Sequence, residues 1–145
     1  MTFFTLVPFM DAQCPFCSPA GEDIVLQNPL CYTRYDGYPV SKGHLLIIPL
    51  RHVASFFELT EDERKAASEL IWQANAKLAS DLHPDGYNVG VNVGLAAGQT
   101  VMHAHIHLIP RYLGDVPDPR GGVRFVIPEK ARYWQDAGER TKIAK

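Results

Sequence analysis

Three of the six histidines in this 145-residue sequence lie within five positions, as His103, His105 and His107. The apolar residues Ala104 and Ile106 separate them. Because side chains of a β-strand alternate between its two faces, this spacing predicts three imidazoles on one face and an apolar face turned to the core. An imidazole can act as a nucleophile, a proton carrier or a metal ligand near neutral pH. We therefore expect this strand to carry the chemistry of the protein.

A single metal ion bound by all three imidazoles is excluded by distance. The rise of a strand puts His103 and His107 roughly 13 Å apart along the backbone, whereas the ligand atoms on one zinc ion are only about 4 Å apart. At most one of the three is therefore expected to bind a metal. A purely structural row is also disfavoured, because burying three unpartnered imidazoles would cost a few kcal/mol each.

Nucleophilic catalysis is the third explanation for the row. A neutral imidazole can attack phosphorus or a carbonyl carbon when an acceptor holds its other ring nitrogen. Hydrogen-bond donors are also needed for the oxygens that gain charge. Gly98 would let the backbone approach a phosphate closely, and Gln99, Thr100 and His107 would add donors.

Cys14 and Cys17 form a second candidate group, a Cys-x-x-Cys pair. A redox pair favours a helix N-terminus, which lowers the pKa of a thiol, and the following Ser18-Pro19 offers little of that. Zinc would need two further ligands, so zinc, redox chemistry and coincidence all remain open on the pair alone. Cys31 stands in a predicted strand and is expected to be a core residue.

The order of predicted elements is typical of an α+β fold, an antiparallel sheet with one long helix on it. Residues 60–63, Thr-Glu-Asp-Glu, match a capping box, and apolar residues then recur at helical spacing as far as Leu82. The apolar run 44–49 predicts a strand that is covered on both faces. Strands are predicted at residues 24–26, 30–35, 44–49, 87–93 and 103–108.

Length and composition favour a domain at residues 1–114 followed by an extension at 115–145, mostly irregular, with a short helix from Pro128. A net charge of −2 gives no overall attraction to nucleic acid or to an acidic membrane. Residues 1–10 are apolar but lack the basic start of a signal peptide, and no run approaches the roughly 20 apolar residues of a membrane span. With an odd number of cysteines, a cytoplasmic location is expected.

The stretch from Gly98 to Ile109 closely resembles the signature of the histidine-triad family, in which three histidines alternate with apolar residues after Gly-Gln-Ser/Thr. The resemblance extends upstream to Asp36, to residues 43–52 and to Asn92. It implies a five-stranded antiparallel sheet with helices, usually paired into a homodimer that shares a continuous sheet.

The resemblance also implies a mechanism. His105 would attack the α-phosphorus of a nucleotide, and water would hydrolyse the nucleotidyl-histidine intermediate. His107 and Gln99 would assist as catalytic residues, Asp36 would bind the ribose hydroxyls, and His44 would be a buried orienting residue. The implied nucleotide-binding residues are Asp36, His44, Asn92, Gly98, Gln99, Thr100, His105 and His107.

Some histidine-triad proteins, and the related galactose-1-phosphate uridylyltransferases, pair a Cys-x-x-Cys motif with two histidines. The resemblance therefore implies a structural Zn²⁺ held by Cys14, Cys17, His52 and His103. The alternative is that His103 forms hydrogen bonds within its strand. No organic cofactor is expected.

A dinucleoside polyphosphate such as diadenosine tetraphosphate is the first substrate implied, and a nucleoside phosphoramidate of the AMP-amine type is the alternative. Transfer to phosphate is less favoured because relatives that do this tend to replace the third histidine, and His107 is present here. A nucleotide-binding adaptor with incidental activity is a further alternative. Two weaker expectations are a purine pocket lined by Phe16, Leu26 and Leu30, and contacts to distal phosphates from Arg111, Arg120 and Arg124.

Overall fold

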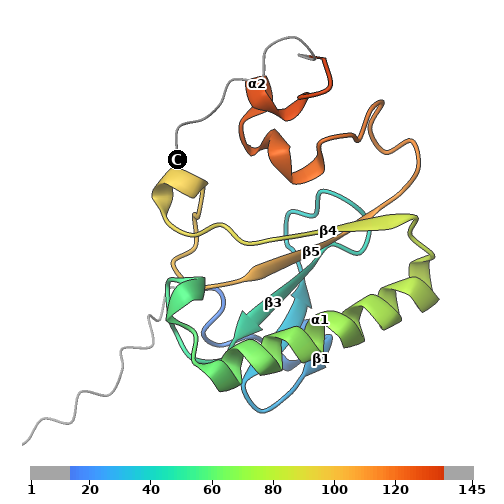
Figure 1. The fold of residues 1–145 in the computed structure, drawn as a ribbon. Helices are drawn as coiled ribbons and strands as arrows, with labels where there is room; N and C mark the ends of the chain where they lie inside the picture. The colour runs from blue at the N-terminus through green and yellow to red at the C-terminus, as the bar shows by residue number, and fades with distance from the viewer. Residues whose placement is uncertain (1–13, 136–145) are drawn as a thin grey trace, which may run out of the picture.

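The computed structural model describes residues 14–135, so the predictions for residues 1–10 and for the last ten residues fall outside it. The core element is a five-stranded sheet in the order β1-β2-β3-β5-β4, in which every neighbouring pair is antiparallel. One long helix, α1 (Glu61–Leu82), lies across the sheet (Figure 1). This confirms the predicted α+β fold class. The strands are β1 (Leu26–Gln27), β2 (Cys31–Tyr35), β3 (Leu45–Pro49), β4 (Gly86–Gly90) and β5 (Ile106–Arg111).

Strand β3 occupies the centre of the sheet, between β2 and β5. All five of its residues are buried, as its continuous apolar run predicted. One of its faces packs against helix α1 through Leu45 and Ile47, and the other packs Leu46 and Ile48 against Phe16. The centre of the sheet is therefore a rigid base for residues 103–108, the histidine segment, which runs beside it.

Helix α1 begins where the capping box predicted. The Thr60 hydroxyl accepts a hydrogen bond from the backbone N–H of Glu63, and the Glu63 carboxylate accepts one from the backbone N–H of Thr60. The predicted apolar stripe buries Leu70 and Leu78 completely against the sheet, which stabilises the fold by roughly 2 kcal/mol per leucine. Cys31 is fully buried under this stripe, and burial, with the nearby Glu63 carboxylate, raises the pKa of its thiol to about 11.

The histidine segment departs from the prediction of a strand from residue 103. Strand β5 begins only at Ile106, and its pairing with β3 ends at Ile47 opposite Ile106. Beyond that point Ala104 donates its backbone N–H to the carbonyl of Val53, at 2.7 Å, instead of to β3. The predicted alternation of faces still holds from Ala104 onward, since Ala104, Ile106 and Leu108 are buried.

Other strand boundaries also differ from those predicted. Strand β1 is shorter and later than residues 24–26, and β4 ends at Gly90 instead of continuing to Val93. The chain after β4 leaves the sheet and reaches the short helix η3 (Leu95–Ala97), which opens the Gly98 turn. The other short 3₁₀ helices are η1 (Gly21–Asp23), η2 (Phe56–Glu58) and η4 (Gly122–Val126).

In the described part of the extension, η4 packs beside β4, and the short helix α2 (Pro128–Ala131) packs on η4; both are drawn in orange and red in Figure 1. The predicted short helix from Pro128 is thereby confirmed. The division into a domain and an extension at residue 114 stays a prediction. Within residues 14–135, no helix has the length and apolar character needed to cross a membrane.

Candidate active site and adjoining metal cluster

A pocket of about 380 Å³ lies over the face of the sheet opposite helix α1, where Arg34 of β2, Leu46 of β3 and His107 of β5 stand side by side. Strand β5 and the segment before it supply two imidazoles, the end of β2 supplies a carboxylate, and the loop after β4 supplies polar groups. The predicted site residues that line this pocket are Asp36, Asn92, Gly98, Thr100, His105 and His107.

His105 is held in one tautomer by its own backbone. Its Nδ1 lies 2.8 Å from the carbonyl oxygen of His103. A carbonyl can only accept a hydrogen bond, so in the neutral ring Nδ1 carries the proton and Nε2 has the lone pair. The ring of Phe16 packs edge-on against this imidazole, with the centroids 5.1 Å apart. The geometry therefore leaves His105 with an unprotonated nitrogen in a pocket wall, as a nucleophile needs.

His107 is held in the opposite tautomer by a chain of hydrogen bonds. The backbone N–H of Val40 donates to Nδ1 of His44 at 3.2 Å, so His44 carries its proton on Nε2. The Nε2 atom of His44 lies 2.9 Å from Nδ1 of His107, to which it donates, and 3.4 Å from a carboxylate oxygen of Asp36. Since Nδ1 of His107 accepts, its proton must be on Nε2, and His107 becomes a hydrogen-bond donor in the pocket.

Both imidazoles of this chain are neutral near pH 7. Burial, together with the neighbouring His105 and His44, lowers the pKa of His107 to about 4, although Asp36 acts in the opposite direction. Burial also lowers the pKa of His44, which is 3% exposed. The chain therefore transmits orientation through neutral hydrogen bonds and adds no positive charge to the pocket.

Gln99 lies elsewhere than predicted. Its side chain is buried and its amide is used entirely by backbone groups. Nε2 donates to the carbonyls of Ala54 at 2.7 Å and Val101 at 3.1 Å, and Oε1 accepts from the N–H of Gly94 at 2.8 Å. The pocket-lining residues among those described do not include Gln99. In this structure Gln99 braces the loop, and its contact with a phosphate stays a prediction.

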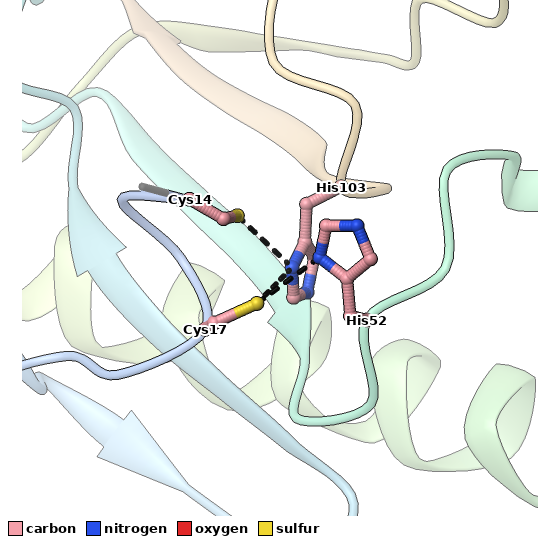
Figure 2. A group of neighbouring side chains, drawn as sticks. All are labelled: Cys14, Cys17, His52 and His103. Atoms are coloured by element: carbon pink, nitrogen blue, oxygen red, sulfur yellow. Dashed lines mark hydrogen bonds between the residues drawn. The ribbon is translucent and has the colours of Figure 1, made fainter. Parts of the chain in front are cut away.

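The four predicted zinc ligands come together in one cluster (Figure 2). The ring of Phe16 packs edge-on against His103 of this cluster, with the centroids 6.0 Å apart. Their ligand atoms all lie within 4.8 Å of one another. Nδ1 of His103 is 3.5 Å from Sγ of Cys14 and 3.6 Å from Sγ of Cys17, and Nδ1 of His52 is 3.0 Å from Sγ of Cys17. Sulfur and nitrogen ligands on a tetrahedral zinc ion are separated by about 3.5 Å. The donor set and its spacing therefore fit Zn²⁺.

The tautomer of His103 also fits a metal. This ring is fully buried, and its Nε2 lies 2.7 Å from the carbonyl oxygen of Pro49. Nε2 must therefore carry the proton, and the lone pair of Nδ1 points toward the two thiols. The ring of His103 lies in the cysteine cluster and is not among the described residues that line the pocket. Burial lowers the pKa of His103, which favours the neutral ring that a metal requires.

Several residues lie elsewhere than the weaker predictions placed them. Phe16 lines the pocket, but Leu26 packs under helix α1 and Leu30 lies at the surface. The pocket-lining residues among those described include none of the three arginines proposed for distal phosphates. Each has another partner: Arg111 pairs with Asp115 and Arg120 with Asp118, while Arg124 donates to two backbone carbonyls of α2, those of Lys130 and Ala131.

Sequence reasoning missed Arg34 and Tyr38 as pocket residues. Arg34 is two positions before Asp36, so the period of a strand puts both on one face. That spacing could have indicated Arg34. For Tyr38 the sequence offers no comparable pattern, because it follows the turn at Asp36-Gly37.

The HIT domain family matches residues 19–114, about two thirds of the sequence. The chain belongs to the HIT domain family. Among relatives of this HIT protein, a 16.1 kDa HIT-like protein of Mycoplasma pneumoniae is 35% identical over 68% of this chain and 72% of its own. An AP-4-A phosphorylase of Mycobacterium tuberculosis is 33% identical over 63% of this chain, which spans only 48% of that enzyme. A zinc-bound histidine triad family protein from Mycobacterium smegmatis has a similar structure, with a TM-score of 0.64 and 27% identity over 88% of this chain and 98% of that one.

Proposed function

We propose that this HIT protein is a nucleotide hydrolase that attacks the α-phosphate of adenine-nucleotide conjugates through His105. The observation that carries the proposal is the hydrogen bond from Nδ1–H of His105 to the carbonyl of His103, which directs the lone pair of the neutral ring to Nε2. A nucleotide-binding adaptor would have no use for an imidazole prepared in this way.

In the proposed first step, Nε2 of His105 forms a bond to the α-phosphorus, and the bond from that phosphorus to the leaving group breaks. Nε2–H of His107 donates to a phosphoryl oxygen as its charge grows. In the second step water attacks the same phosphorus, the bond to His105 breaks, and a nucleoside monophosphate leaves. Asp36, at the rim of the pocket, accepts the ribose hydroxyls, and the Gly98 turn lies against the phosphates. Asn92 and Thr100 offer polar side chains beside that turn.

A dinucleoside polyphosphate such as diadenosine tetraphosphate is the first proposed substrate, and an AMP-amine phosphoramidate is the second. The relationship to an AP-4-A phosphorylase supports the first class. It also makes inorganic phosphate an acceptor to test, because attack by phosphate in the second step would release ADP where water releases AMP. His107, still present in this chain, favours water.

We also propose that Cys14, Cys17, His52 and His103 hold a structural Zn²⁺. Four protein ligands complete a tetrahedral site, so the ion would supply a cross-link between the Cys-x-x-Cys loop and the histidine segment. The zinc-bound relative supports this assignment. A homodimer with a continuous sheet and a cytoplasmic location stay predictions from the family resemblance.

The proposal is tested by the His105→Asn variant, with diadenosine tetraphosphate and adenosine phosphoramidate as substrates and phosphate present or absent. We expect turnover of the preferred substrate to fall at least about a thousandfold, because the attacking atom is removed. His83→Asn is the matched control. His83 ends helix α1 with a φ of 51°, a conformation that asparagine tolerates, so wild-type turnover is expected. If His105→Asn turns over substrate at the wild-type rate, the mechanism is overturned. If the wild-type protein binds nucleotide but turns over neither substrate, the adaptor function is favoured.

A further inference from the structure

Residues 49–54, the connector, comprise the last residue of β3 and the chain that leads from it toward helix α1. The connector contacts the metal cluster at two points. Its Pro49 carbonyl accepts the hydrogen bond from Nε2 of His103, at 2.7 Å. Its His52 is itself a member of the cluster. Both imidazoles of the cluster therefore depend on where this short segment lies, one as part of it and one through a hydrogen bond.

The same connector also forms hydrogen bonds with the histidine segment and with the loop that contains Gly98 and Gln99. The Val53 carbonyl accepts the backbone N–H of Ala104, and the Ala54 carbonyl accepts Nε2 of Gln99, both at 2.7 Å. Since Ala104 lies between His103 and His105, a displacement of the connector would also move the carbonyl that orients the nucleophile.

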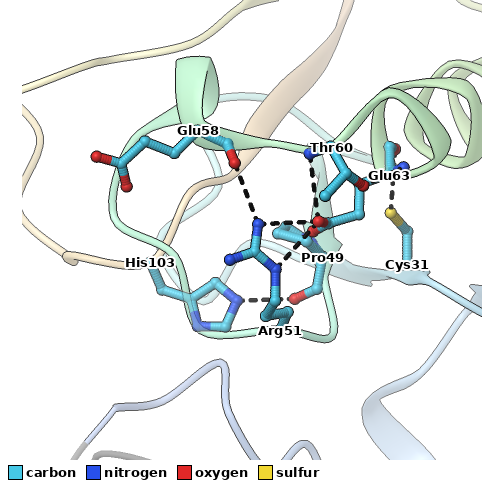
Figure 3. Close-up of polar contacts among 7 residues, drawn as sticks. All are labelled: Cys31, Pro49, Arg51, Glu58, Thr60, Glu63 and His103. Atoms are coloured by element: carbon cyan, nitrogen blue, oxygen red, sulfur yellow. Dashed lines mark hydrogen bonds and ion pairs between the residues drawn. The ribbon is translucent and has the colours of Figure 1, made fainter. Parts of the chain in front are cut away.

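An ion pair ties this connector to the first turn of helix α1 (Figure 3). Nε and Nη2 of Arg51 donate to the same carboxylate oxygen of Glu63, at 3.0 Å and 2.9 Å. Nη2 also donates to the backbone carbonyl of Glu58, at 3.1 Å. Arg51 thus joins the connector to η2 and α1 through three hydrogen bonds.

The burial of Glu63 indicates that this contact does more than cap the helix. The residue is only 4% exposed, and one of its carboxylate oxygens has no hydrogen-bond partner among residues 14–135. A glutamine can serve equally well in a capping box, and a buried carboxylate is costly unless a cation is paired with it. Burial acts to raise the pKa of Glu63, but hydrogen bonds from Arg51 and Thr60 outweigh it and keep the group charged. The negative charge of Glu63 is therefore explained by its ion pair with Arg51, which lies outside the helix.

We propose that Arg51 and Glu63 are positioning residues for the metal cluster: their ion pair fixes the connector so that His52 and His103 converge on the two cysteines. This inference rests on the zinc site proposed above. Neither residue is among the proposed ligands, and neither lines the pocket.

The test measures zinc affinity by competition with a chelator in the full-length protein, for the wild type, Arg51→Ala, Glu63→Gln and the double variant. Mutation of residues that hydrogen-bond to metal ligands typically lowers metal affinity by about 10- to 100-fold. Arg51 and Glu63 do not contact the ligand side chains and act on them through the connector. We expect each single variant to bind zinc about tenfold more weakly. The double variant should be no weaker than either single variant, because both remove one interaction.

Four further variants separate positioning from general damage. Arg64→Ala and Glu61→Gln make the same changes at exposed positions of the same helical turn and should bind zinc like the wild type. Thr60→Ala removes the cap on Glu63 but leaves the Arg51 contact, so the melting temperature should fall while zinc affinity stays unchanged. Arg51→Lys keeps the charge without the two-pronged contact and should recover affinity only in part.

The outcomes distinguish the two proposals. Wild-type protein that takes up less than about a tenth of an equivalent of zinc would overturn the zinc site and this inference together. Wild-type binding with unchanged affinity in Arg51→Ala and Glu63→Gln, or with losses that add in the double variant, would overturn the positioning role alone. If Glu63→Gln does not fold, Arg51→Ala and Arg51→Lys decide, since Arg51 is half exposed.

Discussion

The hydrogen-bond chain through His107 predicts a specific loss of stability at mildly acidic pH. In the folded protein burial and the neighbouring imidazoles lower the pKa of His107 to about 4, while in the unfolded chain a histidine titrates near 6.5. Between these values the unfolded state binds more protons, so the free energy of unfolding falls as the pH is lowered. From these two pKa values, the titration of His107 lowers the free energy of unfolding by about 2 kcal/mol between pH 7 and pH 5.

The matched perturbation is His107→Asn. The amide oxygen of asparagine can accept the hydrogen bond from Nε2 of His44, and the amide does not titrate in this range. Urea unfolding of both proteins, followed by circular dichroism at pH 7 and pH 5, gives the change in unfolding free energy for each. The stability that His44, the proposed zinc site and other groups lose at low pH is common to the wild type and the variant, so it cancels in the difference between the two proteins. We expect the wild type to lose about 2 kcal/mol more than the variant. A difference below about 0.5 kcal/mol would refute the buried, neutral chain.

Two further predictions concern the backbone around the site. Gly43 has a φ of +90°, and a Cβ there would lie 2.6 Å from a methyl carbon of Leu82, so Gly43→Ala should destabilise the fold by about 2 kcal/mol or more. Gly86→Ala, where a Cβ would meet nothing within 4 Å, should cost about 1 kcal/mol or less in the same urea titration; equal losses would contradict the steric argument. Gln99→Met should lower the free energy of unfolding by about 1–3 kcal/mol, because backbone groups of Ala54, Val101 and Gly94 lose a buried partner. A neutral substitution there would contradict the bracing role.

Local patterns were enough to predict the elements that carry the site. The capping box located the start of helix α1, because its hydrogen bonds join residues only three positions apart. The apolar run of β3 and the alternation from Ala104 to Leu108 indicated which faces are buried. The grouping of Cys14, Cys17, His52 and His103 came from the family resemblance, and no local pattern would have joined residues so far apart.

Tertiary structure alone decided how each histidine is used. Nothing in the spacing of His103, His105 and His107 says which ring nitrogen carries the proton, because the partners are a distant carbonyl at Pro49, a local carbonyl at His103 and the imidazole of His44. The inward turn of Gln99 was hidden for the same reason, since one of its partners is 45 positions away in the sequence. The sequence by itself determined the residue types and the strand and helix periods. The folded chain supplied the partners that assign each nitrogen a role, because a hydrogen bond between distant segments forms only when packing brings them together.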